Sequence, residues 1–309
     1  MIKIFLPGEA LIDQIRKSDR EINSIGGATF NVAHALSRYD YLETFFIGSV
    51  GNDKYGKLIN DFADKNNIKK TYLKTIEKPT TIAIKTLADN GERSFLFERG
   101  ADEDLEFVNE NFDVLFLSSA TSVATEKSAK VYKQYLDKAT EQKKIIIYDP
   151  NYRAFLFNDD PEKFKEIALP YLNKAHIIKL SEEEANILSK KHEFKNLAFE
   201  NSILIFITLG KDGCMIVDKD NGVHLIESIK INQVDTTGAG DAFIANVTAQ
   251  LLKKYPNLDK LKKIKVESIK EIVKKANIAA AITTTRDGAA EAMPELNEIE
   301  DTYTKTQGN

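Results

Sequence analysis

The sequence predicts an α/β fold in which a mostly parallel sheet is covered by helices on both faces and carries a small antiparallel β insertion. Two observations lead to this class. Along most of the chain short apolar runs alternate with helical patterns, whereas residues 71–100 hold several β-rich runs close together. Alternating strands and helices favour parallel βαβ units, which are buried on both faces. We expect one domain over residues 1–309, with the insertion contributed by about 11–25 and 71–107.

The first part of the chain opens on a short apolar run, which Pro7 and Gly8 end. Apolar residues recur at helical spacing from Asn31, so a helix is expected there. In the β-rich region, Asp89-Asn90-Gly91 predicts a hairpin turn, because Asn-Gly favours the turns that join two antiparallel strands. The elements expected up to residue 107 are strands at 2–6, 44–50, 71–73, 80–87 and 94–97, and helices from 31 and at 55–66.

The alternation of strands and helices resumes in the second part of the chain. An antiparallel hairpin is expected from two β-rich runs joined through Asn221 and Gly222. An alanine-rich buried helix is expected near the end, after a lysine-rich surface segment. The elements expected here are strands at 114–117, 145–148, 177–180, 203–208, 213–217 and 223–226, and helices at 127–140, 161–172, 182–188 and 271–284.

Composition and charge argue against several classes of protein. With a net charge of −4 the chain lacks the basic surface that nucleic acids and membranes attract, and no apolar run is long enough to span a bilayer. Its one cysteine, Cys214, cannot form an intramolecular disulfide, so we expect a buried thiol in a cytoplasmic protein. The four histidines are scattered without a Cys/His cluster, so no transition-metal site is expected.

The most informative stretch is Asp235-Thr236-Thr237-Gly238-Ala239-Gly240-Asp241-Ala242-Phe243. An alanine-rich run follows it and predicts a buried helix that begins at or just after Gly238. A helix start offers unpaired N–H groups and the positive end of the helix dipole, which suit an anion. Asp241 falls in the first turn, close enough to act as a base on a hydroxyl beside that anion. The alternative is a plain glycine-rich turn before an acidic helix start.

Motifs that are absent narrow the chemistry further. The chain has neither G-x-x-x-x-G-K-[ST] nor G-x-S-x-G, and Gly238-Ala239-Gly240 lacks the third glycine of a dinucleotide fingerprint. What remains fits phosphoryl transfer to a hydroxyl, which needs an anion cradle, a base, a divalent metal on the phosphates and exclusion of water. Gly26-Gly27 and Asn31 offer a close backbone approach and an amide for a sugar hydroxyl, and the β insertion offers a lid.

At these motifs the chain resembles the ribokinase-like carbohydrate kinases, the phosphofructokinase-B family, and looks closest to their fructokinase branch. Two signatures carry the resemblance, Gly26-Gly27-Ala28-Thr29-Phe30-Asn31-Val32-Ala33 and the 235–243 stretch. Between them, Thr80-Thr81-Ile82-Ala83, Asp149-Pro150-Asn151-Tyr152-Arg153 and Thr208-Leu209-Gly210-Lys211-Asp212-Gly213 follow in the family's order. The resemblance implies a ribokinase-like three-layer sandwich with a small antiparallel β lid. It also implies a phosphotransferase that uses ATP and an alcohol acceptor.

By this resemblance Asp241 would deprotonate the sugar hydroxyl, and the backbone amides of Gly238, Ala239 and Gly240 would stabilise the transferring phosphoryl group. The residues that would hold the sugar are Asp13, Gly26, Gly27, Asn31, Phe97, Arg99 and Arg153. For Arg153 the alternative is a surface charge with no part in the site. The residues that would bind ATP are Lys179, Thr208, Gly210, Gly213 and Asn277.

The same resemblance implies two cations. Glu184 would organise Mg²⁺ through water, although Ser181 stands where the family's element begins with asparagine. A monovalent cation, K⁺ in many relatives, would bind beside the anion cradle. The residues aligned with that loop are Asp235, Thr237, Thr283 and Gly288.

Fructose is the expected acceptor and fructose 6-phosphate the product, with 2-keto-3-deoxygluconate, ribose or a nucleoside as alternatives within the family. A non-catalytic sugar or nucleotide sensor and a nicotinamide-dependent dehydrogenase are alternatives from other classes. The insertion also predicts a homodimer, because two such sheets could pack through an apolar face. That face would consist of Ile82, Ile84, Phe95 and Phe97, unless the lid folds it onto its own active site.

Overall fold

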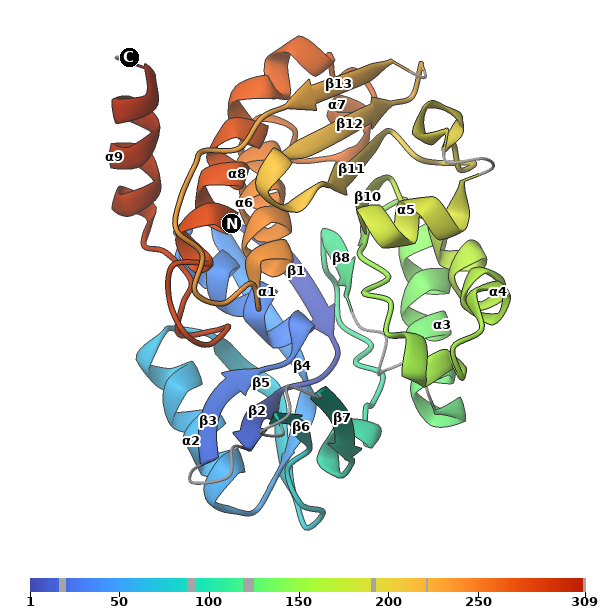
Figure 1. Cartoon of the computed structure of the whole chain (residues 1–309). Coiled ribbons are helices and arrows are strands. Elements are labelled where there is room, and N and C mark those ends of the chain that lie inside the picture. Colours follow the sequence, from blue (N-terminus) through green and yellow to red (C-terminus); the bar gives the residue numbers. More distant parts are fainter. Residues whose placement is uncertain (17–20, 88–92, 119–124, 190–192, 221, 308–309) are drawn as a thin grey trace.

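A large sheet runs through the centre of the protein (Figure 1). The structure, a computed structural model, describes residues 1–16, 21–87, 93–118, 125–189, 193–220 and 222–307. Its 9-stranded sheet has the order β13-β12-β11-β10-β9-β8-β1-β4-β5. Neighbouring strands are parallel from β5 through to β11, and β12 and β13 add an antiparallel edge. The strands are β1 (Ile2–Pro7), β4 (Leu42–Gly51), β5 (Lys69–Ile76), β8 (Val114–Leu117), β9 (Ile145–Tyr148), β10 (Ile177–Ser181), β11 (Leu204–Thr208), β12 (Cys214–Asp218) and β13 (Val223–Ile226).

Helices cover both faces of the large sheet, so the predicted α/β class is confirmed (Figure 1). On one face pack α1 (Ala28–Ser37), α6 (Ala239–Lys254) and α8 (Lys270–Thr283), and on the other α3 (Glu126–Glu141), α4 (Pro161–Leu172) and α5 (Glu182–Leu188). The strands between these layers are apolar on both sides because neither side meets water. The remaining helices are α2 (Lys54–Lys65), α7 (Leu258–Leu261) and α9 (Leu296–Gln307), with 3₁₀ turns at Ala101–Glu103, Ala154–Phe157, Phe194–Asn196, Gly210–Asp212 and Val266–Ile269. None of the helices in the described ranges is long and apolar enough to cross a bilayer.

A second, smaller sheet lies below the large one in the view of Figure 1. Its order is β3-β2-β6-β7, formed by β2 (Leu11–Arg16), β3 (Glu21–Gly26), β6 (Ile82–Leu87) and β7 (Arg93–Glu98). Because β2 and β6 pair in parallel, the sheet is mixed rather than antiparallel throughout. The assignment of residues 71–73 to the insertion is wrong, since β5 pairs in parallel with β4 in the large sheet. The predicted turn at Asp89-Asn90-Gly91 lies outside the described residues.

The register of the small sheet corrects the apolar face expected from the sequence. Ile84 lies opposite Leu96, whereas Phe97 lies opposite Ala83. Directly opposed residues share a face and successive residues alternate, so the isoleucines of β6 and Phe97 point to opposite sides. Ile84 is only 2% exposed within the single chain, which removes the argument for a homodimer through this face. The face that was predicted from Ile82, Ile84, Phe95 and Phe97 therefore does not form.

The two faces of the small sheet have different neighbours. Helix α2 covers the Ile84 face, where the buried Gln14 donates a hydrogen bond to the hydroxyl of Tyr55 at 3.4 Å. Asp13 lies opposite Ala83 in the parallel pair and therefore shares the other face with Phe97. The Phe97 side of the small sheet thus presents a carboxyl group and an aromatic ring toward the large-sheet part of the protein.

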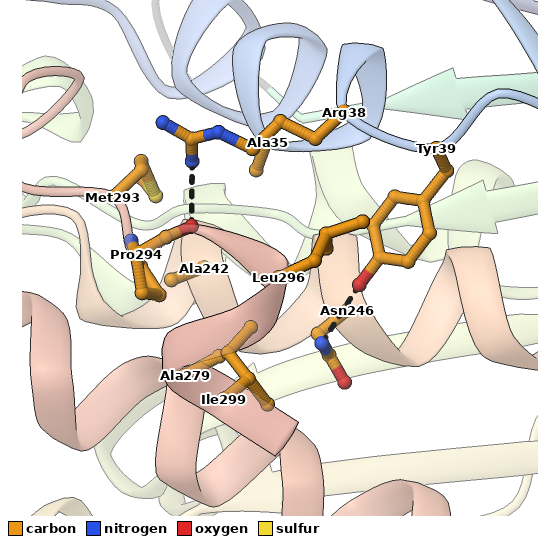
Figure 2. A pocket seen from close by; sticks show the side chains of 10 residues that line it. All are labelled: Ala35, Arg38, Tyr39, Ala242, Asn246, Ala279, Met293, Pro294, Leu296 and Ile299. Carbon is orange, nitrogen blue, oxygen red and sulfur yellow. Dashed lines mark hydrogen bonds between the residues drawn. The ribbon is translucent and has the colours of Figure 1, made fainter. Parts of the chain in front are cut away.

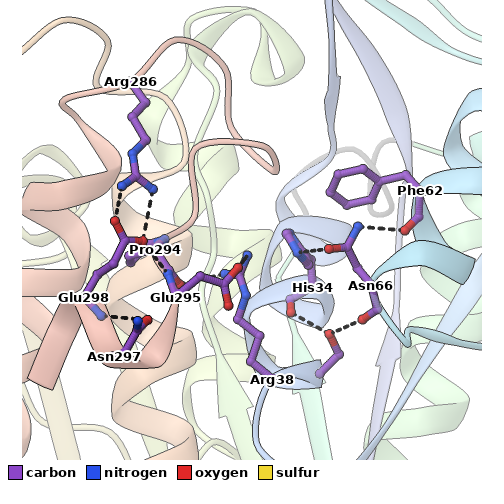
Figure 3. A network of polar contacts seen from close by, with 10 residues as sticks. His34, Arg38, Phe62, Asn66, Arg286, Pro294, Glu295, Asn297 and Glu298 are labelled. Carbon is purple, nitrogen blue, oxygen red and sulfur yellow. Dashed lines mark hydrogen bonds and ion pairs between the residues drawn. The ribbon is translucent and has the colours of Figure 1, made fainter.

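The chain after α8 runs back across the molecule before it forms α9 (Figure 1). We call residues 285–295 the C-terminal strap. Arg38, the C-cap residue of α1, donates from Nη1 to the carbonyl of Pro294 at 2.8 Å, and Arg286 pairs with Glu298 (Figure 3). Beneath the strap Asn246 donates to the hydroxyl of Tyr39 at 2.9 Å, in a narrow pocket lined by the end of α1 and the residues after it, by α6, α8 and α9, and by the strap itself (Figure 2). These contacts fix the strap against the helices that carry the site residues.

Candidate active site

The start of α6 brings the predicted base and the predicted sugar ligand together. Gly238 is the N-cap with φ of +79°, a left-handed conformation that glycine adopts readily, so the predicted helix start is confirmed. Asp241 stands in the first turn of α6. Asn31 reaches it from α1 and donates from Nδ2 to Asp241 Oδ2 at 2.8 Å. The Oδ1 atom of Asn31 is buried without a hydrogen-bond partner among the described residues, which leaves an acceptor for a ligand hydroxyl.

Burial raises the pKa of the Asp241 carboxyl, which the hydrogen bond from Asn31 and the positive charges of Lys179 and Arg153 oppose. A carboxylate with a raised pKa is a stronger base than an exposed one, because the proton it accepts relieves the cost of a buried charge. The arrangement therefore suits abstraction of a proton from a hydroxyl held at the N-terminus of α6.

A fixed positive charge lies beside this helix start. Lys179 of β10 forms a buried ion pair with Asp149, with 3.1 Å between Nζ and Oδ2. Its Nζ is 3.0 Å from the position that a Cβ on Gly240 would take, so the ammonium group faces the glycines directly. Burial favours the neutral amine, but the carboxylates of Asp149, Glu184 and Asp241 outweigh it and raise the pKa of Lys179. The charged ammonium and the helix N-terminus together form a site for an anion.

The Gly26-Gly27 turn admits no side chain at either position. A Cβ on Gly26 would lie 2.0 Å from Oδ2 of Asp13, and one on Gly27, where φ is +101°, would lie 2.5 Å from the carbonyl of Glu9. Glu9 Oε1 accepts a hydrogen bond from the N–H of Ala28 at 3.2 Å, which fixes the end of the turn. The Asp13 carboxyl is thus held directly against the turn. Burial raises its pKa to about 7, although the charge of Arg153 opposes the shift.

Aromatic and charged side chains connect the small sheet with the segment after β9. The rings of Phe97 and Phe155 lie 5.4 Å apart, and Phe155 belongs to the 3₁₀ turn Ala154–Phe157. Arg99 pairs with Asp102 at 3.0 Å and lies 5.8 Å from the Phe97 ring. Arg153 is exposed and donates to the carbonyl of its neighbour Tyr152, yet its positive charge opposes the rise in the pKa of both Asp13 and Asp241. The Arg153 guanidinium therefore lies within electrostatic reach of both carboxyl groups.

Glu184 stands at the N-terminus of α5, where it forms a capping box with Ser181. One carboxylate oxygen accepts from the N–H of Ser181 and the other from the N–H of Tyr152, both at 2.6 Å. Each oxygen has a second lone pair, so a water can still bind. The described residues contain no group of three or more acidic, histidine or cysteine side chains that could hold a metal by themselves.

The residues predicted for the nucleotide lie around β11 and β12. Thr208 ends β11, and a tight turn from Gly210 leads into β12. Gly213 has φ of +103°, and a Cβ there would lie 2.2 Å from the carbonyl of Ile226. A Cβ on Gly210, in contrast, would have no atom within 4 Å. Asn277 is buried and donates to the carbonyl of Ile226 at 2.9 Å, so its amide holds the end of β13. Gly213 and Asn277 thus support the local backbone.

The two loops predicted to hold a monovalent cation lie side by side. The N–H groups of Val234 and Asp235 donate to the carbonyl of Thr284 at 2.7 and 3.2 Å. One oxygen of Asp235 accepts from both the N–H and the hydroxyl of Thr237. The hydroxyl of Thr283 donates within α8, and Gly288 adopts φ of +89°. Backbone carbonyls and the Asp235 carboxylate are among the oxygens that these loops can offer to a cation.

The sequence predicted no role for three residues that lie at the site: Asp149, which stands in a quoted motif, Glu9 and Phe155. Asp149 directly follows the buried run that became β9, and an acidic residue at the carboxyl end of a parallel strand is a recognisable signal. The same signal applied to Glu9 after β1. Phe155 carried no such signal, because its role depends on a ring from the small sheet.

Comparisons with known proteins show the family of this chain. The model of the pfkB family carbohydrate kinases matches residues 1–296. A probable fructokinase-2 of Arabidopsis thaliana is 29% identical over 308 residues, covering 95% of this chain and 91% of that protein. Fructokinase-1 of Zea mays is 30% identical and covers 94% of both chains. Among solved structures, a fructokinase from Xylella fastidiosa with bound ATP superposes with a TM-score of 0.84 at 24% identity, covering 99% of both chains.

The class that this fold and site define is an ATP-dependent phosphotransferase with an alcohol group as acceptor. The chain belongs to the pfkB family of carbohydrate kinases.

Proposed function

We propose that this sugar kinase is a fructokinase, which transfers the γ-phosphoryl group of ATP to fructose and forms fructose 6-phosphate. The observation that carries the proposal is the hydrogen bond from Asn31 to Asp241, because it joins the sugar-side turn to the base at the helix start. Support for fructose comes from relatives that are named fructokinases, at 29% to 31% identity.

In the proposed reaction the chain's residues hold both substrates and move one proton. Asp241 accepts the proton of the primary hydroxyl of the sugar. At the same time, the oxygen of that hydroxyl forms a bond to the γ-phosphorus. The bond between that phosphorus and the bridging oxygen of ADP breaks, and ADP leaves with the electron pair. The N–H groups of Gly238 to Gly240 and the ammonium of Lys179 stabilise the charge on the phosphoryl oxygens. Asn31, Asp13 and the Gly26-Gly27 turn orient the sugar.

Two cations complete the proposal. Mg²⁺ would neutralise phosphate charge, held on the protein side by Glu184 through water, and K⁺ would be bound by the loops of Asp235 and Gly288. Activity that survives a chelator would remove Mg²⁺ from the mechanism. Equal activity in sodium and potassium salts would remove K⁺.

The substrate is tested with a panel of fructose, 2-keto-3-deoxygluconate, ribose and a nucleoside, each with ATP, by release of ADP. The proposal is supported if kcat/KM is highest with fructose. If kcat/KM is higher with another acceptor, that acceptor is the substrate instead of fructose. Binding without ADP release across the panel would favour a sensor.

The role of Asp241 is tested by replacing it with asparagine. Asp241→Asn should keep the fold and lose on the order of 10²–10⁴ in kcat, the range that general-base catalysis supplies. Wild-type turnover in this variant would exclude Asp241 as the base.

A homodimer through the small sheet stays a prediction, but the surface proposed for it is now the exposed edge strand β7. Leu96 of β7 is 56% exposed, and light scattering of the wild-type chain and of Leu96→Ser decides whether this strand joins two copies.

A further inference from the structure

The C-terminal strap contacts the small sheet at one residue of its free edge. In the order β3-β2-β6-β7, β3 is an edge strand, so its outward N–H and C=O groups need partners from outside the sheet. At Ile25 the strap provides both partners. Glu291 Oε1 accepts from the N–H of Ile25 at 2.8 Å, and the N–H of Ala290 donates to the carbonyl of Ile25 at 3.4 Å.

Ile25 directly precedes the Gly26-Gly27 turn. The hydrogen bonds to the backbone of Ile25 therefore hold the start of this turn in place. The side chain of Ile25 is 2% exposed. The far end of the turn is held by Glu9, which accepts from the N–H of Ala28. A carboxylate therefore binds the backbone on each side of the two glycines. One of them comes from the strand end beside the turn and the other from a segment 266 residues away in sequence.

The same part of the strap also contacts the start of α6, where Gly238, Ala239 and Gly240 form what we call the phosphoryl cradle. A Cβ on Gly238 would lie 3.2 Å from Cα of Ala289, so the strap backbone packs directly against the N-cap of α6. A Cβ on Gly288 would lie 3.3 Å from Oε2 of Glu291 and 3.5 Å from Cβ of Ser24. Residues 288–291 thus touch the start of α6 on one side and β3 on the other.

We propose that Glu291 is a positioning residue that holds the sugar-binding turn in register with the phosphoryl cradle. It acts through the backbone of Ile25, and its charge also contributes to the raised pKa of the Asp13 carboxyl. The inference rests on the proposed function in placing the sugar at Gly26-Gly27. A backbone N–H that loses a charged acceptor at a partly buried position leaves the turn free to shift, and the sugar site is the first to lose its geometry.

Kinetics of three variants test the proposal. Glu291→Ala should raise KM for the best sugar of the panel about tenfold, the effect of losing one hydrogen bond to a charged group, with KM for ATP changed less than about twofold. Glu291→Gln keeps an acceptor oxygen and should stay within about threefold of wild type. The control Glu295→Ala removes a strap carboxylate that pairs with Arg38 at 3.2 Å instead, and should change neither KM.

Hydrogen exchange gives a second measurement that does not depend on activity. The amide of Ile25 should exchange faster in Glu291→Ala than in wild type and in Glu295→Ala, while amides in the centre of α6 stay protected. Unchanged exchange at Ile25, or equal rises in KM for sugar and ATP, would overturn the role of Glu291. If the wild-type enzyme phosphorylates no sugar, the proposed function fails, and the exchange rates still decide whether Glu291 fixes the turn.

Discussion

Replacing Asn31 with leucine tests the connection between the two halves of the site. Leucine has nearly the size of asparagine but cannot donate to Asp241, so the 2.8 Å hydrogen bond is lost. A hydrogen bond to a charged group contributes roughly 1.5–3 kcal/mol, and about 1.4 kcal/mol corresponds to a tenfold change in an equilibrium constant. Because Asn31 stabilises the ionised carboxylate, its loss should raise the pKa of Asp241 further, and kcat/KM at a pH below that pKa should fall about ten- to hundredfold.

The shift appears in the pH dependence of kcat/KM, followed by ADP release from about pH 5 to about pH 9.5. Only the ionised carboxylate accepts a proton, so activity falls as the pH drops through the pKa of Asp241. In Asn31→Leu the acidic limb should move to higher pH, while the lost sugar contact lowers the whole profile. Asp13→Asn is the control, because it shows how much of the acidic limb is caused by the titration of Asp13 rather than of Asp241. A limb that stays at its wild-type pH in Asn31→Leu would refute the reasoning.

Three further experiments examine groups around the site. The pKa of Asp13 is raised to about 7, so its charged form destabilises the fold as pH rises through that value. The Tm of Asp13→Asn should therefore exceed that of wild type by more at about pH 8 than at about pH 5. Equal gains in Tm at the two pH values would count against the raised pKa. Phe155→Ala loses the ring contact with Phe97, a pair of a type that contributes about 0.5–1.5 kcal/mol, so KM for the sugar should rise about two- to tenfold while KM for ATP does not. Lys179→Met leaves the buried Asp149 carboxylate unpaired and should cost about 3–5 kcal/mol in urea unfolding. Adding Asp149→Asn should restore that stability but not kcat, and recovery of kcat would exclude Lys179 from phosphoryl transfer.

The layers of the fold could be predicted because they depend on local patterns. Buried strands and amphipathic helices alternate in the sequence as they do in the structure, and the glycine before α6 marked a helix start. Pairing was harder to predict, because a β-rich run does not show which neighbour it joins. Residues 71–73 follow a helix and lie near other β-rich runs, yet they extend the large sheet beside β4. Likewise, a shift of one residue in register changes the face of every side chain, which is why Ile84 and Phe97 were wrongly placed together.

The site was predictable where one short motif held several of its residues. Asp241 and Asn31 each stand in such a motif, and their contact follows from the packing of α1 against α6. The position of Lys179 against Gly240 needed the order of strands in the sheet, and Glu291 needed the path of the strap. Neither can be seen from spacing along the chain. Where helices and loops from distant segments meet, only the folded structure identifies the contact.

The first strand of the chain lies inside the large sheet, between β8 and β4, and this has a consequence for folding. Both neighbours of β1 come from later parts of the chain, and α6 can dock on α1 only after Ala239–Lys254 has been synthesised. Contacts between such distant segments close late and slowly, because loop closure costs entropy before packing compensates for it. Refolding should therefore restore helical circular dichroism first, and enzymatic turnover only when the last third of the chain has docked.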